Sequence, residues 1–398
     1  MKPHPHAASL TRLAFSGYFL VGAAGVVFAP LLPSIIAEFD LSLTAAALLF
    51  PALSLGGLVG GLGAGPLVDR FGTKPVVLGS VALSALGMLA TAAGATWHLV
   101  LAGLATMGLG QRALGTSLNT LVARVNPEQS GKYLNYLHGV YGTGALIAPL
   151  VIGAALVVEG TWRWIFAAPA LLWLLFLAAA ARRAFPAAAP RRGARRLSLR
   201  LLAGNPVLAT LLLVAFGYNG VSFSLLGWVK TYLDLAGNVQ PFLSTGMISI
   251  FYAALTLGRF ICGTVARRLG YAPTVLMCAA GTAVAYPLVV VSQAPALLAT
   301  GVFLSGLFLS GLYPTALAIA MSTFNEKAGT VTGLLTTAMT AGSMLPPWWT
   351  GAIADAAGFR TAMAVNMVIV FMLVAAALAL VRRAPGAGAP ASAGQAAR

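Results

Sequence analysis

Apolar runs of roughly 20 residues repeat along almost the whole chain, and this is the length that an α-helix needs to cross the hydrocarbon core of a membrane. Apolar residues make up 59% of the 398 residues and charged residues 8%. So few charges could not cover a normal solvated surface. The sequence therefore predicts an all-α integral membrane protein. Its twelve predicted spans are residues 10–29, 43–64, 75–94, 97–122, 132–158, 162–181, 206–232, 242–266, 272–291, 295–323, 327–352 and 360–382.

A basic motif recurs at equivalent places in the two halves of the chain. It reads GPLVDRFGTK at residues 65–74, after the second span, and returns in reduced form as GTVARRLG at residues 263–270, after the eighth span. The two copies start 198 residues apart, and the same spacing relates Pro75 to Pro273 and several glycines to one another without gaps. This register indicates a duplicated unit. We therefore expect two pseudo-symmetric six-helix bundles.

The predicted domains follow from this duplication. Residues 1–181 form the N-terminal bundle and residues 206–384 the C-terminal bundle. Between them, residues 182–205 are rich in Pro, Ala and Arg and lack an apolar stripe, which predicts a mobile basic linker at the cytoplasmic leaflet. The tail, residues 385–398, is rich in Ala, Gly and Pro and is predicted to be disordered.

Basic residues are distributed unevenly between the two ends of the spans. The segments that join even-numbered spans to the next odd one, with the two termini, hold 19 of the 24 basic residues, whereas the opposite side holds Arg163, Lys230 and Arg360. Positive charge marks the cytoplasmic side, so we expect a multi-pass protein of the inner (plasma) membrane with both termini cytoplasmic. The net charge of +16 follows this topology and has no interleaved aromatic residues, which argues against a nucleic-acid partner.

The motif at residues 65–74 and its copy resemble the signature loop of the major facilitator superfamily. Residues 160–166, entering the sixth span, and residues 355–360, entering the twelfth, are similar to the usual loops of that family. The resemblance covers nearly the whole chain. It implies a transporter embedded in the lipid bilayer, with a central cavity between the bundles. Such a protein binds a small-molecule substrate there and moves it by alternating access.

The same resemblance suggests a gate on the inner side. Asp69, Arg70 and Lys74 are expected to pair across the bundle interface in one state of the cycle. Arg259 and Arg268, at the inner end of the eighth span, are assigned to the same gate. For Arg259 the alternative is a side chain that snorkels to the surface and anchors the loop.

A finer resemblance points to one branch of the family. Residues 216–222 and 228–233 are similar to the seventh-span pattern of the fucose/glucose permeases, which are sugar:cation symporters, and Asn119, Asn135 and other residues of the fourth, fifth and tenth spans fit the same branch. The resemblance implies a sugar substrate. The chain departs from it because Ser222 stands where the branch has a glutamate.

Arg112 lies close to the middle of the fourth span, where a charge is costly enough to suggest a function. Asn119 shares its helix face. Two interpretations stay open: an arginine satisfied by backbone carbonyls between helices, or a donor that binds a carboxylate, a phosphate or sugar hydroxyls. His138 lies inside the fifth span, whereas His4 and His6 precede the first span and His98 is at the outer end of the fourth, and histidine titrates near neutral pH. His138 is either a hydrogen-bonding group or a proton site.

Polar side chains also share faces in the C-terminal half. Hydroxyls and amides there suit polyhydroxylated solutes, and Trp228 is placed to stack on a sugar ring. The alternative is that Ser and Thr hydroxyls bond back to their own helices. The predicted substrate-binding residues of both halves are Arg112, Asn119, Asn135, His138, Tyr141, Tyr218, Asn219, Ser222, Trp228 and Tyr313.

All eight acidic residues fall in loops or near predicted helix ends. Carriers coupled to protons or sodium usually hold the coupling ion with a carboxylate inside the membrane. The sequence thus leaves open facilitated diffusion, coupling through His138, and exchange of an anion balanced by Arg112, so a proton or sodium ion is an undecided partner.

The leading hypothesis is a monomeric secondary transporter that moves a small polar solute, a sugar, by alternating access. The alternative transporter is an exporter of drugs or organic anions, because residues 144–153 partly resemble the fifth-span motif of antiporters. An enzyme is disfavoured because there is no phosphate loop, no metal-ligand pattern and no nucleophile with a paired base. We therefore expect no catalytic residue and no cofactor. A receptor is disfavoured because the segments outside the spans are too short for a signalling domain.

Overall fold

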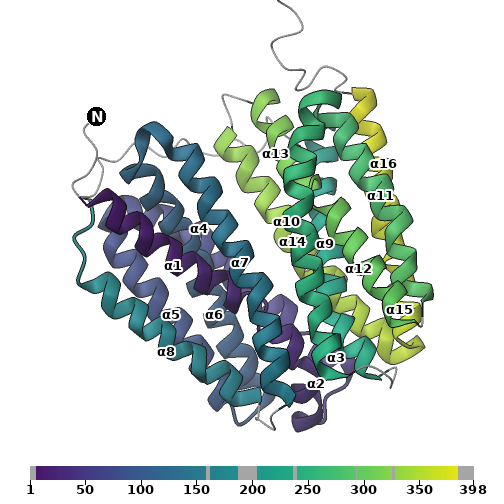
Figure 1. Ribbon diagram of the computed structural model, residues 1–398, viewed down its shortest axis with the longest axis horizontal. Coiled ribbons are helices and arrows are strands. Elements are labelled where there is room, and N and C mark those ends of the chain that lie inside the picture. The colour runs from purple at the N-terminus through teal and green to yellow at the C-terminus, as the bar shows by residue number, and fades with distance from the viewer. Residues whose placement is uncertain are drawn as a thin grey trace, which may run out of the picture. The chain divides into compact units, whose positions relative to one another are not determined.

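The computed structural model describes residues 6–157, 162–186, 204–235, 240–292, 294–324 and 328–383, and nearly all of them are helical. Residues 187–203 of the predicted linker and all of the predicted tail lie outside the described residues. The helices before the linker are α1 Ala7–Ala24, α2 Phe28–Phe39, α3 Leu43–Ala46, α4 Leu49–Phe71, α5 Thr73–Ala93, α6 Trp97–Val125, the 3-10 helix η1 Pro127–Gln129, α7 Ser130–Val157 and α8 Trp162–Ala181 (Figure 1). Those after it are α9 Pro206–Leu235, α10 Pro241–Leu269, α11 Tyr271–Val291, α12 Pro295–Leu309, α13 Leu312–Thr323, α14 Ala328–Ala357, α15 Phe359–Val365 and α16 Met367–Arg383.

Each predicted span coincides with one helix or one broken helix, but the start of the chain needs a correction. The first span, predicted at residues 10–29, is α1 followed by α2, with a bend of 40° between them. Pro30 has no N–H to continue the α1 ladder, which favours a break just before it. The structure also extends this pair to Phe39, ten residues beyond the predicted end.

The basic motif is a second correction. It was expected to be a turn between helices, yet Asp69 and Arg70 lie in the last turn of α4, and Gly72 alone separates α4 from α5. Likewise, Arg267 and Arg268 lie in the last turn of α10. These basic side chains therefore project from the C-terminal ends of helices, where the negative end of the helix dipole stabilises the charge of an arginine.

Among the described residues, nine helices are long and apolar enough to cross a membrane, or ten if α1 and α2 form one span. The long helices α6 and α14 are absent from that set although they have 29 and 30 residues. Both helices are therefore long enough to cross a membrane, but they are less apolar than the other nine. Both carry polar residues along their middle turns, and α6 holds Arg112 and Asn119.

The chain forms two compact units, each with its own packing. Unit 1 comprises Met1–Ala194 and Leu233–Ser249, and unit 2 comprises Arg195–Tyr232 and Ile250–Arg398. In unit 1, α4 and α5 both pack on α6, and α1 lies alongside α7 (Figure 1). In unit 2, α11 packs against α12 and α16.

The predicted duplication is visible in individual contacts. Gly144 of α7 lies so close to α1 that a Cβ there would collide with the carbonyl oxygen of Phe19. Gly342 of α14, 198 residues later, has the same relation to the carbonyl oxygen of Phe216 on α9. Helices that approach this closely at glycine gain packing contacts, which is the main attraction between helices in lipid. Both units therefore use one crossing geometry.

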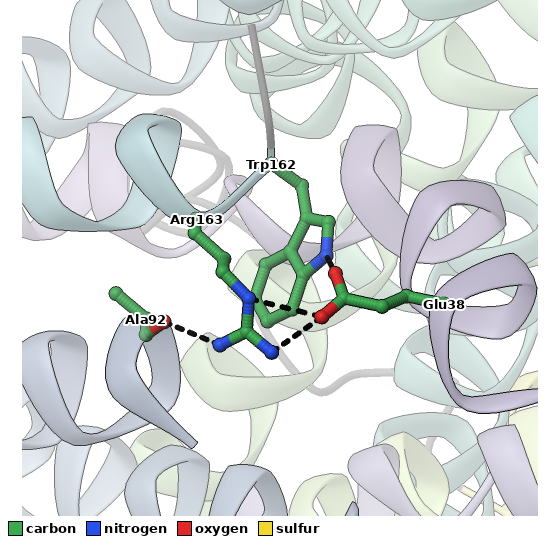
Figure 2. Close-up of polar contacts among 4 residues, drawn as sticks. All are labelled: Glu38, Ala92, Trp162 and Arg163. Atoms are coloured by element: carbon green, nitrogen blue, oxygen red, sulfur yellow. Dashed lines mark hydrogen bonds and ion pairs between the residues drawn. The ribbon is translucent and has the colours of Figure 1, made fainter. Parts of the chain in front are cut away.

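Arg163 at the start of α8 joins the ends of α2 and α5 (Figure 2). Its Nε donates to Oε1 of Glu38 over 3.0 Å, and its Nη1 donates to the carbonyl oxygen of Ala92 over 2.6 Å. Trp162 donates its indole N–H to the other Glu38 oxygen. In unit 2, Arg360 repeats part of this cluster, because its Nη2 donates over 3.3 Å to the last carbonyl of α11. The cluster satisfies helix termini that would otherwise lack partners.

The junction glycines give the first prediction. Gly72 has φ 84° and ψ 168°, and Gly270 has φ 87° and ψ 167°, a region that is almost closed to residues with a Cβ. Replacing Gly72 with Ala should lower the free energy of unfolding by about 1–3 kcal/mol, measured by thermal unfolding in detergent. Gly65→Ala is the matched control, because a Cβ at Gly65 meets nothing within 4 Å. Equal melting temperatures for the two variants would contradict this account.

Candidate functional site

Tyr18 of α1 is the centre of a polar cluster within unit 1. The residue is 4% exposed, and its hydroxyl reaches α6, where it accepts a hydrogen bond of 2.5 Å from Nδ2 of Asn119. The same hydroxyl donates to the carbonyl oxygen of Gly115 over 3.4 Å. Gly115 and Asn119 are four residues apart and so share one face of α6. Tyr18 therefore links α1 to the polar face of α6.

Two aromatic side chains of α7 complete the surroundings of Tyr18. The ring of His138 stands edge-on to the Tyr18 ring, with centroids 5.4 Å apart and an interplanar angle of 88°. The ring of Tyr141 lies 6.4 Å away at 66°. His138 and Tyr141 are three residues apart, which brings them to the same side of α7. Edge-to-face contacts of this kind favour a fixed ring arrangement.

Arg112 lies near the middle of α6 and is exposed. Its side chain runs past α4, where a Cβ on Gly57 would come within 2.9 Å of the Arg112 Cγ. Glycine at that position therefore makes room for the arginine. Arg112 lies three residues before Gly115, one turn along α6, and so belongs to the helix face that Tyr18 contacts and to the same cluster.

Two ion pairs lie at helix ends of unit 1, and neither includes Arg112. They are Arg124 with Asp69 at 3.7 Å and Arg163 with Glu38 at 2.5 Å. Among the described acids, Glu38, Asp69, Asp234 and Asp355 lie within two residues of a helix end, which agrees with the expectation from the sequence. Glu159 and Glu326 lie outside the described residues.

One acceptor in the cluster is unsatisfied. The Oδ1 atom of Asn119 is buried and has no hydrogen-bond partner among the described residues. Buried polar atoms normally find partners, so this oxygen is available for a donor that enters the cluster. Asn135 lies at an exposed position on α7, one turn before His138. Together the cluster offers a cation, an acceptor and aromatic edges.

In unit 2 the predicted residues have different surroundings. Tyr218 of α9 stacks on Tyr313 of α13, with ring centroids 6.0 Å apart and an interplanar angle of 16°. Asn219 donates to the carbonyl oxygen of Met339 over 2.9 Å and is 4% exposed. The amide of Asn219 therefore holds α9 to α14.

Two predicted residues of unit 2, Trp228 and Ser222, and two threonines of α14 donate hydrogen bonds to backbone carbonyls. Trp228 is fully buried and its indole donates to the carbonyl oxygen of Pro347 over 2.8 Å, so it offers no open face for stacking. Ser222 donates to the carbonyl oxygen of Tyr218 over 2.7 Å. On α14, Thr336 and Thr340 bond back to their own helix. These hydroxyls therefore follow the alternative interpretation, in which Ser and Thr bond back to their own helices.

The predicted gating residues have their recorded contacts inside their own unit. Asp69 pairs with Arg124, Lys74 Nζ donates to the carbonyl oxygen of Ala181 over 2.7 Å, and the Arg70 guanidinium lies 5.0 Å from the Phe71 ring. Arg259 and Arg268 are exposed on α10. The expected pairing with the other half of the chain stays a prediction.

Sequence reasoning missed Tyr18. The tyrosine has no charge and no motif around it, and its importance comes from the approach of α1 to α7. The available signal is weak: Tyr18 is one of three residues with a phenol or imidazole group in the first span and its N-terminal flank, the others being His4 and His6.

Comparisons with known proteins agree with this arrangement. The model of the Major Facilitator Superfamily matches residues 14–286 and 238–398. An uncharacterized MFS-type transporter of Mycobacterium tuberculosis is 30% identical over 218 residues, which are 54% of this chain but 31% of that protein. The cis,cis-muconate transport protein of Acinetobacter baylyi is 28% identical over 304 residues, 71% of each chain. A crystal structure of a D-xylose-proton symporter superposes with a TM-score of 0.77 at 18% identity, covering 94% of this chain and 97% of that one.

The chain belongs to the major facilitator superfamily, and its fold is the all-α fold of that family. Its described helices and its fold are those of a multi-pass membrane protein. The chain spans less than a third of the length of the M. tuberculosis protein, 31%.

Tyr18 gives the second prediction. Replacing Tyr18 with Phe removes the acceptor of the Asn119 amide while it keeps the ring, so the free energy of unfolding should fall by about 1–3 kcal/mol. Thermal unfolding in detergent measures the loss. Tyr136→Phe is the control, because Tyr136 is 52% exposed on α7, and it should change stability by less than about 0.5 kcal/mol. If the two variants melt together, the Tyr18 hydroxyl does not hold α1 to α6.

Proposed function

We propose that this transporter carries a small organic anion and that Arg112 selects its charge. The observation that carries the proposal is the exposed Arg112 near the middle of α6, which belongs to neither of the ion pairs of unit 1 described above. A charge at that depth is costly, and such residues normally face a cavity or a partner. Snorkelling is available to arginines near helix ends, whereas Arg112 lies about 14 residues from either end of α6.

Arginine suits an anionic group because its planar fork donates two parallel hydrogen bonds to a carboxylate or phosphate. Tyr18 and Tyr141 belong to the same cluster, and the edges of aromatic rings bear partial positive charge, which also favours an anion. The relative named for transport of cis,cis-muconate, an organic anion, supports the same substrate class. With the described acids near helix ends, His138 is the group to which we assign any coupling proton.

A sugar is the second candidate. It is favoured by the unsatisfied Oδ1 of Asn119, which needs a hydroxyl or other donor, and by the stacked pair of Tyr218 and Tyr313. The xylose symporter lends it no more than a shared fold. The hydroxyls of Ser222 and the α14 threonines weaken it, because their own helices accept their hydrogen bonds.

Ligand binding separates the two candidates and gives the third prediction. Bound ligand raises the melting temperature of the folded state, so we would titrate the purified chain with cis,cis-muconate, benzoate and D-xylose. An anion should stabilise the wild type, and Arg112→Gln should weaken its binding by at least about tenfold, the loss of one charge-assisted hydrogen bond.

Arg112→Lys should recover part of the affinity because it keeps the charge and loses the fork. Arg259→Gln is the control: it removes another exposed arginine from a long helix, on α10. Stabilisation by xylose alone, retained in Arg112→Gln, would favour the sugar and reject the anion.

We also propose that the basic motif gates transport, as the family resemblance implies, and this gives the fourth prediction. Asp69→Asn should change the uptake rate in proteoliposomes by at least about fivefold, the effect of one charge interaction of about 1 kcal/mol. Arg124→Gln removes the recorded partner of Asp69 inside unit 1. If the Asp69 carboxylate acts only through its ion pair with Arg124, the two variants will have equal uptake rates. Asp69 then has no separate gating role.

A further inference from the structure

A groove runs along one side of unit 1, between α4 and α5. Both helices pack on α6 and make few contacts with each other. The groove has a volume of about 390 Å³, with Leu109 and Ala113 of α6 among the residues that line it. On α4 its wall is formed by Val59, Gly63, Leu67 and Phe71, which recur every four residues. This spacing keeps them on one helix face, so the groove follows the second half of α4.

Two facing glycines keep the groove open. A Cβ added to Gly63 of α4 or to Gly79 of α5 would meet nothing within 4 Å. At the equivalent positions of unit 2, 198 residues later, the chain has Ile261 and Met277. Large side chains therefore occupy in one repeat the positions that are vacant in the other. The groove is a feature of unit 1 and is not required by the shared scaffold.

The groove is apolar along its walls and basic at one end. Ser80 is a polar residue in its lining, and its hydroxyl donates to the carbonyl oxygen of Val76 over 2.6 Å. Phe71 lies at the end of the wall, with the Arg70 guanidinium 5.0 Å from its ring centroid. Asp69, the neighbouring acid, pairs with Arg124. The positive charge of Arg70 therefore lies at one end of the apolar groove.

We propose that the groove binds one acyl chain of a membrane phospholipid whose anionic headgroup lies against Arg70. The apolar walls offer no hydrogen-bond partner to a polar solute, whereas a hydrocarbon chain gains van der Waals contacts along them. In lipid such packing is the main source of affinity between apolar partners. Basic residues at the ends of spans attract anionic lipid headgroups. Chain and headgroup are therefore recognised by different parts of the site.

The test compares two lipids that share their acyl chains. The purified full-length protein in detergent is titrated with dioleoyl phosphatidylglycerol and with dioleoyl phosphatidylcholine, and bound lipid is counted by native mass spectrometry. The wild type should bind the anionic lipid at least about fivefold more tightly, because one juxtamembrane charge contributes about that factor. Arg70→Gln should abolish this preference. Gly79→Leu should weaken binding of both lipids, because leucine fills the groove.

Unit 2 supplies two control variants. Arg268→Gln removes the counterpart of Arg70, and Gly263→Leu, at the counterpart of Gly65, adds a leucine where a Cβ would meet nothing within 4 Å. Neither should change lipid binding. Gly63→Leu fills the groove from the opposite wall and replaces Gly79→Leu if that variant does not fold. Unchanged lipid binding in a folded, filled variant would overturn the proposal. So would a dimer that the filled variants dissociate, since the groove would then bind a second copy of the chain.

Discussion

Close approach of helix backbones is the constraint on which the site depends. Lipid tails are as apolar as leucine, so helices in a membrane are held by packing and hydrogen bonds more than by the hydrophobic effect. In unit 1 the backbone of α1 reaches α7 at Phe19 and Gly144, where a Cβ would not fit. This crossing brings the adjacent Tyr18 within 5.4 Å of the His138 ring. Without the glycine, the aromatic and polar groups of the cluster would be separated.

The scaffold is duplicated, but the chemistry of the cluster is not. Gly342 repeats the crossing of Gly144, and Gly270 repeats the backbone conformation of Gly72. The residues 198 positions after Tyr18, Arg112, Asn119, His138 and Tyr141 are Phe216, Ser310, Leu317, Thr336 and Met339. Packing constraints act on both repeats, whereas at these positions the arginine, the amide, the imidazole and the phenols are present in the first repeat alone. The open groove of unit 1, with Ile261 and Met277 at the matching places in unit 2, follows the same pattern.

The cost of charge in a membrane explains where each arginine lies. Arg163 stands at a helix end and is held by Glu38 and by a helix-terminal carbonyl. Arg112 stands in the middle of a helix and belongs to neither of the ion pairs described above for unit 1. An arginine at a terminus reaches water and dipole ends, but one at mid-helix keeps its charge only beside a polar cavity or a partner. Among the residues of the site, Arg112 therefore has the clearest physical reason to bind a ligand.

The sequence by itself determined the spans, the duplication and the position of Arg112, because apolar length, spacing and depth are properties of the linear chain. It placed the helix boundaries less well, since the basic motif lies mostly in the last two turns of α4. Only the tertiary structure decided which polar groups meet. Tyr18 joins Asn119 through a crossing of helices distant in sequence, while Trp228 and Ser222 are satisfied by backbone carbonyls. Whether a donor faces a ligand or a neighbouring helix depends on that packing, which no local pattern encodes.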